Sequence, residues 1–221
     1  METRKVYEKF KLKLDAVGTT NIAIDKGTFC YLINEAQNKQ IEFFLSNKTD
    51  DNLRYIQKLL KTEEITASNT SHRLYTGFYL PTDYFEFSSA VAIANSGSCK
   101  NIVLDLFEIK NQNKDVIISD EFNSPSFLYR ETPYYIGNQS INVYKDESFE
   151  VSRVILDYYR YPVQVRLIDE DNFESDFNEN YQIEFDDKLT DRIISTAVSD
   201  FQVSIKDGTF QVNRERGVSK I

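Results

Sequence analysis

Apolar side chains recur every three or four residues in both end regions of the sequence, and this spacing predicts amphipathic helices. The first predicted helix covers residues 3–16. The second runs from Phe29 to Leu45, with Thr28 as its N-cap residue. The last begins at Asp187. The apolar positions that define these three helices are Val6, Phe10 and Leu14, then Phe29, Leu32, Ile33, Ala36, Phe43 and Phe44, and finally Leu189, Ile193, Ala197, Phe201 and Ile205.

A shorter third helix is predicted after Asp50 and Asp51, whose negative charges would cap its N-terminus. Its apolar side chains are Leu53, Ile56, Leu59 and Leu60. The final helix is expected to pack on the N-terminal ones. In particular, Phe29, Ile33, Ala36 and Phe43 are predicted to face Phe201, Ala197 and Ile193.

The middle of the sequence alternates apolar and polar residues instead, which predicts half-buried strands. The longest such stretch, residues 149–168, is predicted to form a two-armed hairpin broken at Pro162. Its core-facing side chains should include Leu156 and either Tyr158 or Tyr159. Further predicted strands cover 72–81, 83–95, 101–109, 126–132, 134–137 and 140–146.

Short strands joined by turns predict an antiparallel sandwich or barrel-like domain, so the fold class is α+β. The predicted parts are an N-terminal helical part over 1–66, an antiparallel β domain over 67–168, an acidic loop or arm over 169–186, and a C-terminal helix and tail over 187–221.

Nine carboxylates lie between Asp169 and Asp187, and they include the one arrangement that suggests a metal. Asp176, Asn178, Asn180, Glu184 and Asp187 occupy positions 1, 3, 5, 9 and 12 of an EF-hand loop. However, Tyr181 stands where the turn needs glycine, and Asp187 replaces the usual glutamate. A solvated acidic loop is therefore the preferred interpretation, and no metal is predicted.

Composition limits the function classes. The 221 residues are 41% hydrophobic and 14% aromatic, which is typical of a globular chain. A formal net charge of −9 disfavours unaided binding to nucleic acid or to an anionic membrane. No apolar run is long enough to span a membrane. Cys30 and Cys99 are predicted to be free thiols.

Catalytic patterns are missing from the sequence. His72 is the only histidine, and it has no nucleophile motif beside it. Neither phosphate-binding nor dinucleotide-binding glycine motifs occur. We therefore predict no enzyme activity, no catalytic or metal-binding residues and no cofactor.

Several short motifs, taken in order, resemble the tail-ring (portal-vertex ring) proteins of crAss-like and related short-tailed bacteriophages. The helix-two segment resembles a family element with the pattern F-x-x-x-(L/I)-N-x-A-Q-N. Other resembling elements are an acidic-Leu-Arg helix start, an L-P-x-D-Y turn and a Y-Y-R-Y-P hairpin. The residues that carry them are Phe29, Leu32, Asn34, Ala36–Asn38, Phe43–Phe44, Asp50–Arg54, Leu80–Tyr84, Arg130–Thr132 with Tyr134, Leu156–Pro162, Asp187 and Ile193.

This resemblance implies a virion structural protein that forms a ring, expected to have twelve subunits, in the portal–tail connector. Its partners would be the portal protein and adjacent ring proteins, with DNA only as passing cargo and no membrane. Two alternatives from the residues alone stay open. One is a monomeric carbohydrate-binding β-sandwich using surface tyrosines; the other is a hydrolase using two carboxylates between Asp169 and Asp187.

Overall fold

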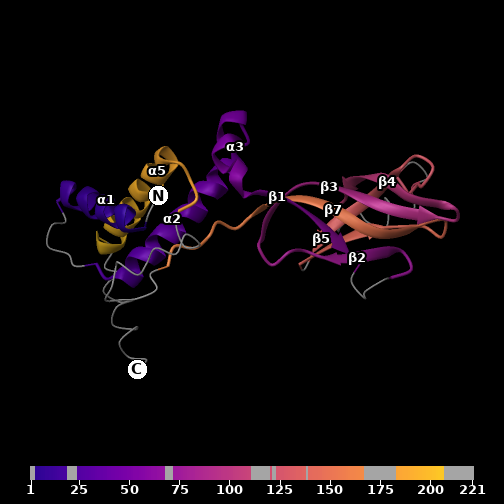
Figure 1. Cartoon of the computed structure of the whole chain (residues 1–221), viewed down its shortest axis with the longest axis horizontal. Helices are drawn as coiled ribbons and strands as arrows, with labels where there is room; N and C mark the ends of the chain where they lie inside the picture. The colour runs from indigo at the N-terminus through magenta and orange to yellow at the C-terminus, as the bar shows by residue number, and fades with distance from the viewer. Residues whose placement is uncertain are drawn as a thin grey trace, which may run out of the picture. The chain divides into compact units, whose positions relative to one another are not determined.

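The computed structural model describes residues 3–18, 24–67, 72–110, 120, 123–137, 139–166 and 183–206. The chain divides into two compact units. Met1–Lys58 and Pro162–Ile221 together form a helical unit, and Leu59–Tyr161 form a sheet unit. The predicted α+β class, with helices from both end regions and a central sheet domain, is confirmed (Figure 1).

The helical unit contains the four α-helices found among the described residues. They are α1 (Thr3–Ala16), α2 (Lys26–Ser46), α3 (Asp50–Ile56) and α5 (Asp187–Lys206), and α3 runs into a 3₁₀ turn, η1 (Gln57–Leu59). Helix α1 ends just before Gly18, whose φ of +83° lies in the left-handed region that favours glycine.

Helix α5 packs against both α1 and α2, which confirms that the two end regions close into one unit. The rings of Phe10 and Phe29 meet edge to face with centroids 5.4 Å apart. The predicted apolar stripes are largely buried, as shown by the side chains of Val6, Phe10, Leu14, Phe29, Ile33, Ala36, Ile193, Ala197 and Phe201. Phe43 is an exception, because it is 55% exposed while its neighbour Phe44 is buried.

Two predicted helix starts were wrong in detail. Asp25, not Thr28, caps α2, and its carboxylate accepts hydrogen bonds from the backbone N–H and the hydroxyl of Thr28. Helix α3 is capped by Thr49, which accepts from the N–H of Asn52, while the carboxylates of Asp50 and Asp51 lie in the first turn.

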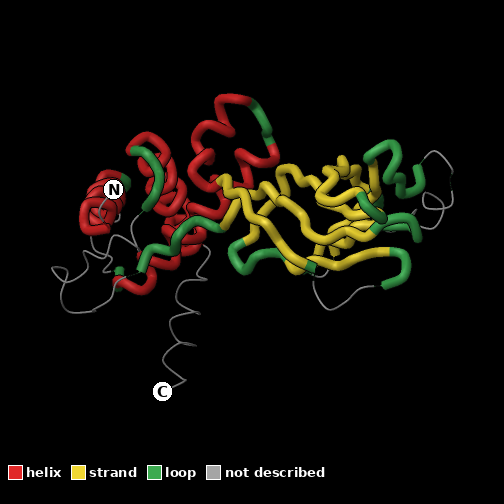
Figure 2. Tube along the Cα trace, turned by 45° about the vertical axis from the view of Figure 1, so that its right-hand side comes forward, coloured by secondary structure: helices red, strands yellow, loops and turns green. Residues whose placement is uncertain are grey.

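The sheet unit is one curled seven-stranded sheet with the strand order β1-β7-β3-β4-β5-β6-β2. The edge strands β1 and β2 approach each other to within 8 Å between Cα atoms, which makes the sheet a half-barrel (Figure 2). The strands are β1 (Leu60–Thr66), β2 (Tyr75–Tyr79), β3 (Tyr84–Ser96), β4 (Cys99–Glu108), β5 (Glu131–Gly137), β6 (Ser140–Tyr144) and β7 (Glu150–Arg160).

Three features of this sheet differ from the sequence-based expectation. The sheet is mixed, because β4 and β5 pair in parallel while the other pairs are antiparallel. Leu60 begins strand β1 instead of ending the third helix. The described part of the 149–168 stretch contains one strand rather than a hairpin, since β7 ends at Arg160 and residues 161–166 continue without strand pairing.

The core of the sheet unit lies on the concave face. Leu156 and Tyr158 on β7 are fully buried, as predicted, and Tyr159 is buried as well. Leu156 and Tyr158 pack in one cluster with buried side chains from all the other strands, including Ile65, Phe78, Ala92, Leu104, Tyr134 and Ile141. The predicted strand over 126–132 is instead a loop that leads into β5 at Glu131.

Candidate functional site

Four polar side chains meet at one end of the concave face, and they form the most connected polar cluster among the described residues of the sheet unit. The hydroxyl of Tyr158 lies 2.7 Å from Oδ1 of Asp83 and 3.0 Å from Oε2 of Glu63. The ammonium group of Lys61 lies 2.9 Å from the Glu63 carboxylate and 3.2 Å from that of Asp83. We call these residues the Tyr158 cluster.

Strand pairing brings the members of this cluster together. In the antiparallel β1–β7 ladder Lys61 lies opposite Tyr158, and Glu63 lies opposite Leu156. Because side chains alternate between the two faces of a strand, Lys61 and Glu63 share the face of buried Ile65. Asp83 comes from the turn before β3. The cluster therefore forms the polar border of an otherwise apolar concave face.

Burial and hydrogen bonding shift the pKa values of three members of the cluster. Burial, reinforced by the hydrogen bond to Asp83, raises the pKa of Tyr158 to about 12. Partial burial alone would raise the pKa of Asp83, but hydrogen bonds from Tyr158 and Lys61 outweigh it and lower that pKa. Hydrogen bonds to Glu63, Tyr158 and Asp83 raise the pKa of Lys61.

At neutral pH the phenol of Tyr158 is consequently protonated, the carboxylate of Asp83 is ionised and Lys61 is charged. General acid–base catalysis works best with a group whose pKa lies near the working pH. The shifts of Tyr158, Asp83 and Lys61 all move away from neutrality. The arrangement is suited to joining chain segments rather than to moving protons.

The cluster joins two of the motifs that carry the resemblance, the L-P-x-D-Y turn and the Y-Y-R-Y-P segment. Besides the contact to Tyr158, the backbone carbonyl of Asp83 accepts a 2.8 Å hydrogen bond from the N–H of Tyr161. The rings of Phe85 and Tyr161 meet edge to face with centroids 4.7 Å apart. The motifs thus mark a junction between two segments that are distant in sequence.

A third motif forms a junction within the helical unit. The side-chain amide of Asn34 donates to the carbonyl of Val165 at 3.0 Å, and its carbonyl oxygen accepts from the N–H of Val165 at 2.8 Å. The amide of Gln37 also donates to Asn34, at 3.0 Å. Helix α2 thereby binds the extended segment after β7 through the N–H and the carbonyl of Val165, whose side chain is buried.

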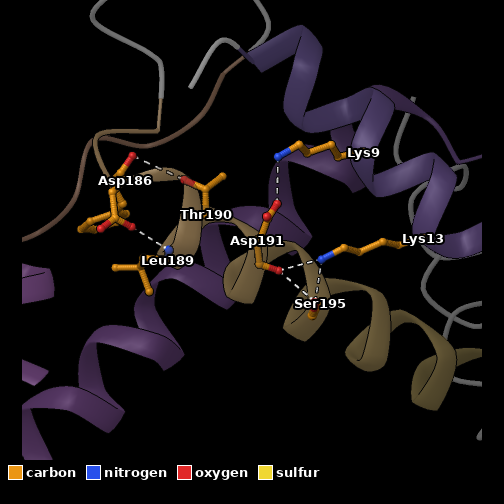
Figure 3. A network of polar contacts seen from close by, with 8 residues as sticks. Lys9, Lys13, Asp186, Leu189, Thr190, Asp191 and Ser195 are labelled. Carbon is orange, nitrogen blue, oxygen red and sulfur yellow. Dashed lines mark hydrogen bonds and ion pairs between the residues drawn. The ribbon is translucent and has the colours of Figure 1, made fainter.

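Polar contacts also tie α1 to α5 (Figure 3). Lys9 donates to the carboxylate of Asp191 at 3.0 Å, while Lys13 donates to the backbone carbonyl of Asp191 and to the hydroxyl of Ser195. At the start of α5, the carboxylate of Asp186 accepts a 2.7 Å hydrogen bond from the N–H of Leu189 and so caps the helix. The contacts to Lys9 and Lys13 hold α5 against α1, with the buried apolar side chains of α5 facing the core of the helical unit.

Those candidates for chemistry that fall among the described residues are not gathered into one site. His72 is exposed, and its ring stacks on Tyr75 with centroids 4.9 Å apart. Cys30 and Cys99 are free thiols. Asp176, Asn178 and Asn180 lie outside the described residues, and so do the other acidic residues from Asp169 to Glu179. Glu184 accepts a 2.7 Å hydrogen bond from the N–H of Val163, and Asp187 is the first residue of α5.

Among the described residues, no three histidine, cysteine, aspartate or glutamate side chains are placed to hold a metal ion. None of the described helices is long and apolar enough to cross a membrane. A scan against protein-family models finds no matching family, and a search of curated proteins finds no match.

Proposed function

We propose that this protein is a virion structural subunit that assembles into an oligomeric ring in the portal–tail connector of a short-tailed phage. The ring, expected to have twelve subunits, would form part of the conduit through which DNA leaves the particle. The proposal rests on the motif resemblance, and one feature of the surface supports it independently.

That feature is the number of large apolar side chains that each unit exposes to solvent. The helical unit exposes Leu12, Tyr31, Phe43 and Val203, and the sheet unit exposes Tyr79, Val103, Leu128, Tyr129 and Tyr161. Tyrosine and phenylalanine are enriched in the buried centres of protein interfaces. A subunit that is covered by neighbours on several sides would bury such side chains, whereas a monomer would leave them in water.

Two further features agree with this role. The motif residues form structural junctions, as the Tyr158 cluster and the Asn34 contact to Val165 illustrate. The formal net charge of −9 also suits a conduit, since an acidic wall repels phosphate groups and gives passing DNA no adhesive contacts.

The mass of the assembled protein tests the proposal. We expect light scattering after size exclusion to give a discrete species of about twelve times the 25.8 kDa chain, alone or after mixing with portal protein. Electron micrographs of that species should show closed rings. A chain that stays monomeric in both experiments contradicts the proposal, and a monomer that binds oligosaccharides would favour a carbohydrate-binding module.

A further inference from the structure

The loop before β5 presents two large apolar side chains on a fixed support. Ser126 and Glu131 exchange two backbone hydrogen bonds of 2.9 and 3.1 Å, which close the loop at its base. The hydroxyl of Ser126 also accepts from the N–H of Tyr129 at 3.2 Å. The carbonyl of Arg130 accepts from the N–H of Asp105 on β4 at 2.7 Å. We call residues 127–130 the β5 loop tip.

The side chains of this tip point in opposite directions. Phe127 packs toward the core against Phe149, with ring centroids 5.8 Å apart. Leu128 and Tyr129 are 83% and 76% exposed, and Leu128 is the most exposed large apolar side chain among the described residues. The side chain of Arg130 is exposed and forms no ion pair with any described residue.

The same unit has a groove of about 480 Å³ that complements the tip. Its lining includes the apolar side chains of Leu74 and Pro125, and Leu74 is 46% exposed. Lys145 and Glu147 also line it, but each already has an ion-pair partner, Glu150 and Arg73 respectively.

Asp146 is the lining carboxylate that lacks a cation among the described residues. It is exposed, and Oδ1 of its carboxylate accepts hydrogen bonds from the N–H and the hydroxyl of Ser148. The groove therefore combines an exposed apolar side chain with one uncompensated negative charge, while the tip combines two exposed apolar side chains with one uncompensated positive charge.

We infer that the β5 loop tip of one copy of this chain binds in the groove of a second copy. Tyr129 and Leu128 would cover Leu74 and Pro125, and Arg130 would pair with Asp146. A groove of this volume falls in the range that holds small organic ligands, so it accommodates such side chains. Tip and groove are unlike surfaces, and contacts between unlike surfaces propagate into rings when the rotation closes.

This inference rests on the proposed ring, for which it supplies a subunit contact. Its first test is a charge exchange in the full chain, followed by sedimentation over a series of concentrations. Arg130→Glu should weaken self-association by about tenfold or more, because two carboxylates would then face each other. Adding Asp146→Lys should restore it. Lys100→Glu, an equal charge reversal at an exposed position outside both surfaces, should have no effect.

The second test is a cross-link between two preparations that lack Cys30 and Cys99. One carries Leu128→Cys and the other Leu74→Cys, and each chain alone should melt like the parent. After mixing under oxidising conditions, we expect a disulfide that joins the two variants. A Val103→Cys preparation replaces the Leu74→Cys one as the control, because Val103 is exposed but does not line the groove.

The outcomes separate the two proposals. If the wild-type chain forms ring-sized particles, but the charge exchange does not change self-association and the cysteine variants form no cross-link, the tip–groove contact is overturned and the ring is kept. A cross-link between the two variants, together with wild-type particles that sediment no larger than a dimer, would support the contact and overturn the ring. Wild-type chains that neither associate nor cross-link would overturn both.

Discussion

The hydroxyl of Tyr158 on β7 lies 2.7 Å from the carboxylate of Asp83, a residue 75 positions earlier in the chain. The ring of Tyr158 is fully buried, whereas Asp83 is partly exposed. The contact therefore connects the apolar concave face to its polar border. It also holds the turn before β3 against the neighbouring strand β7.

Removing this hydroxyl should destabilise the sheet unit without disturbing its packing. We expect Tyr158→Phe to lower the free energy of unfolding by about 1 kcal/mol, because a hydrogen bond to a partly exposed carboxylate contributes about that much. Denaturant unfolding followed by circular dichroism measures this change. Tyr129→Phe is the matched control, since it removes a hydroxyl from an exposed tyrosine. Equal effects of the two substitutions would contradict a special role for Tyr158.

The cluster should also make the free energy of unfolding depend on pH in the acidic range. The pKa of Asp83 is lower in the folded chain than the ordinary value of 3.8, so the folded state binds this proton less tightly than the unfolded state does. The stabilisation from Asp83 is thus complete above 3.8 and is lost as the pH falls through the lower folded pKa. Unfolding midpoints measured in this acid range should fall less steeply for Asp83→Asn than for the parent. Parallel pH profiles would show that Asp83 does not contribute.

Neighbouring residues of β7 should respond very differently to truncation, because they face opposite sides of the sheet. Leu156 is fully buried, whereas Ile155 is only partly buried. Leu156→Ala should cost about 3 kcal/mol through the lost burial and the remaining cavity. Ile155→Ala should cost about 1 kcal/mol or less. Similar losses from both substitutions, measured by thermal or denaturant unfolding, would contradict the assigned concave face.

The sequence predicted elements well where burial imposes a simple period. The apolar residues of α5 recur every four positions, and Leu156 and Tyr158 lie two apart, so one buried face specifies each element. Strand β1 lacks such a signal, because Ile65 is its only buried residue. Leu59 and Leu60 continue the helical spacing of Leu53 and Ile56, so the local pattern predicts a helix at the point where β1 begins.

The Tyr158 cluster could not be predicted, because its members are brought together only by strand pairing. Glu63 and Tyr158 are 95 residues apart and belong to strands that are first and last in sequence order but adjacent in the sheet. The parallel pairing of β4 with β5 escaped prediction for a related reason. Residues 126–130 have the apolar content of a strand, but they form a loop. Strand β5 begins only after this loop and pairs with β4 in parallel.

Asn34 offers the sharpest test of the motif residues in the helical unit. Its side-chain amide satisfies both the N–H and the carbonyl of Val165, whose side chain is fully buried. Asn34→Ala would leave both backbone groups and the amide of Gln37 without this partner, so we expect a loss of about 2 kcal/mol in the free energy of unfolding.

Two further variants separate the hydrogen bonds of Asn34 from its position on α2. In Asn34→Asp the side chain still accepts from the N–H of Val165 but no longer donates to its carbonyl, so the loss should be intermediate. Asn38→Ala, one helical turn later and partly exposed, should change stability by less than about 0.5 kcal/mol. Amide hydrogen exchange at Val165 is the direct measurement. Its N–H should exchange faster in Asn34→Ala than in the parent or in Asn38→Ala, and unchanged protection would show that α2 does not hold this segment through Asn34.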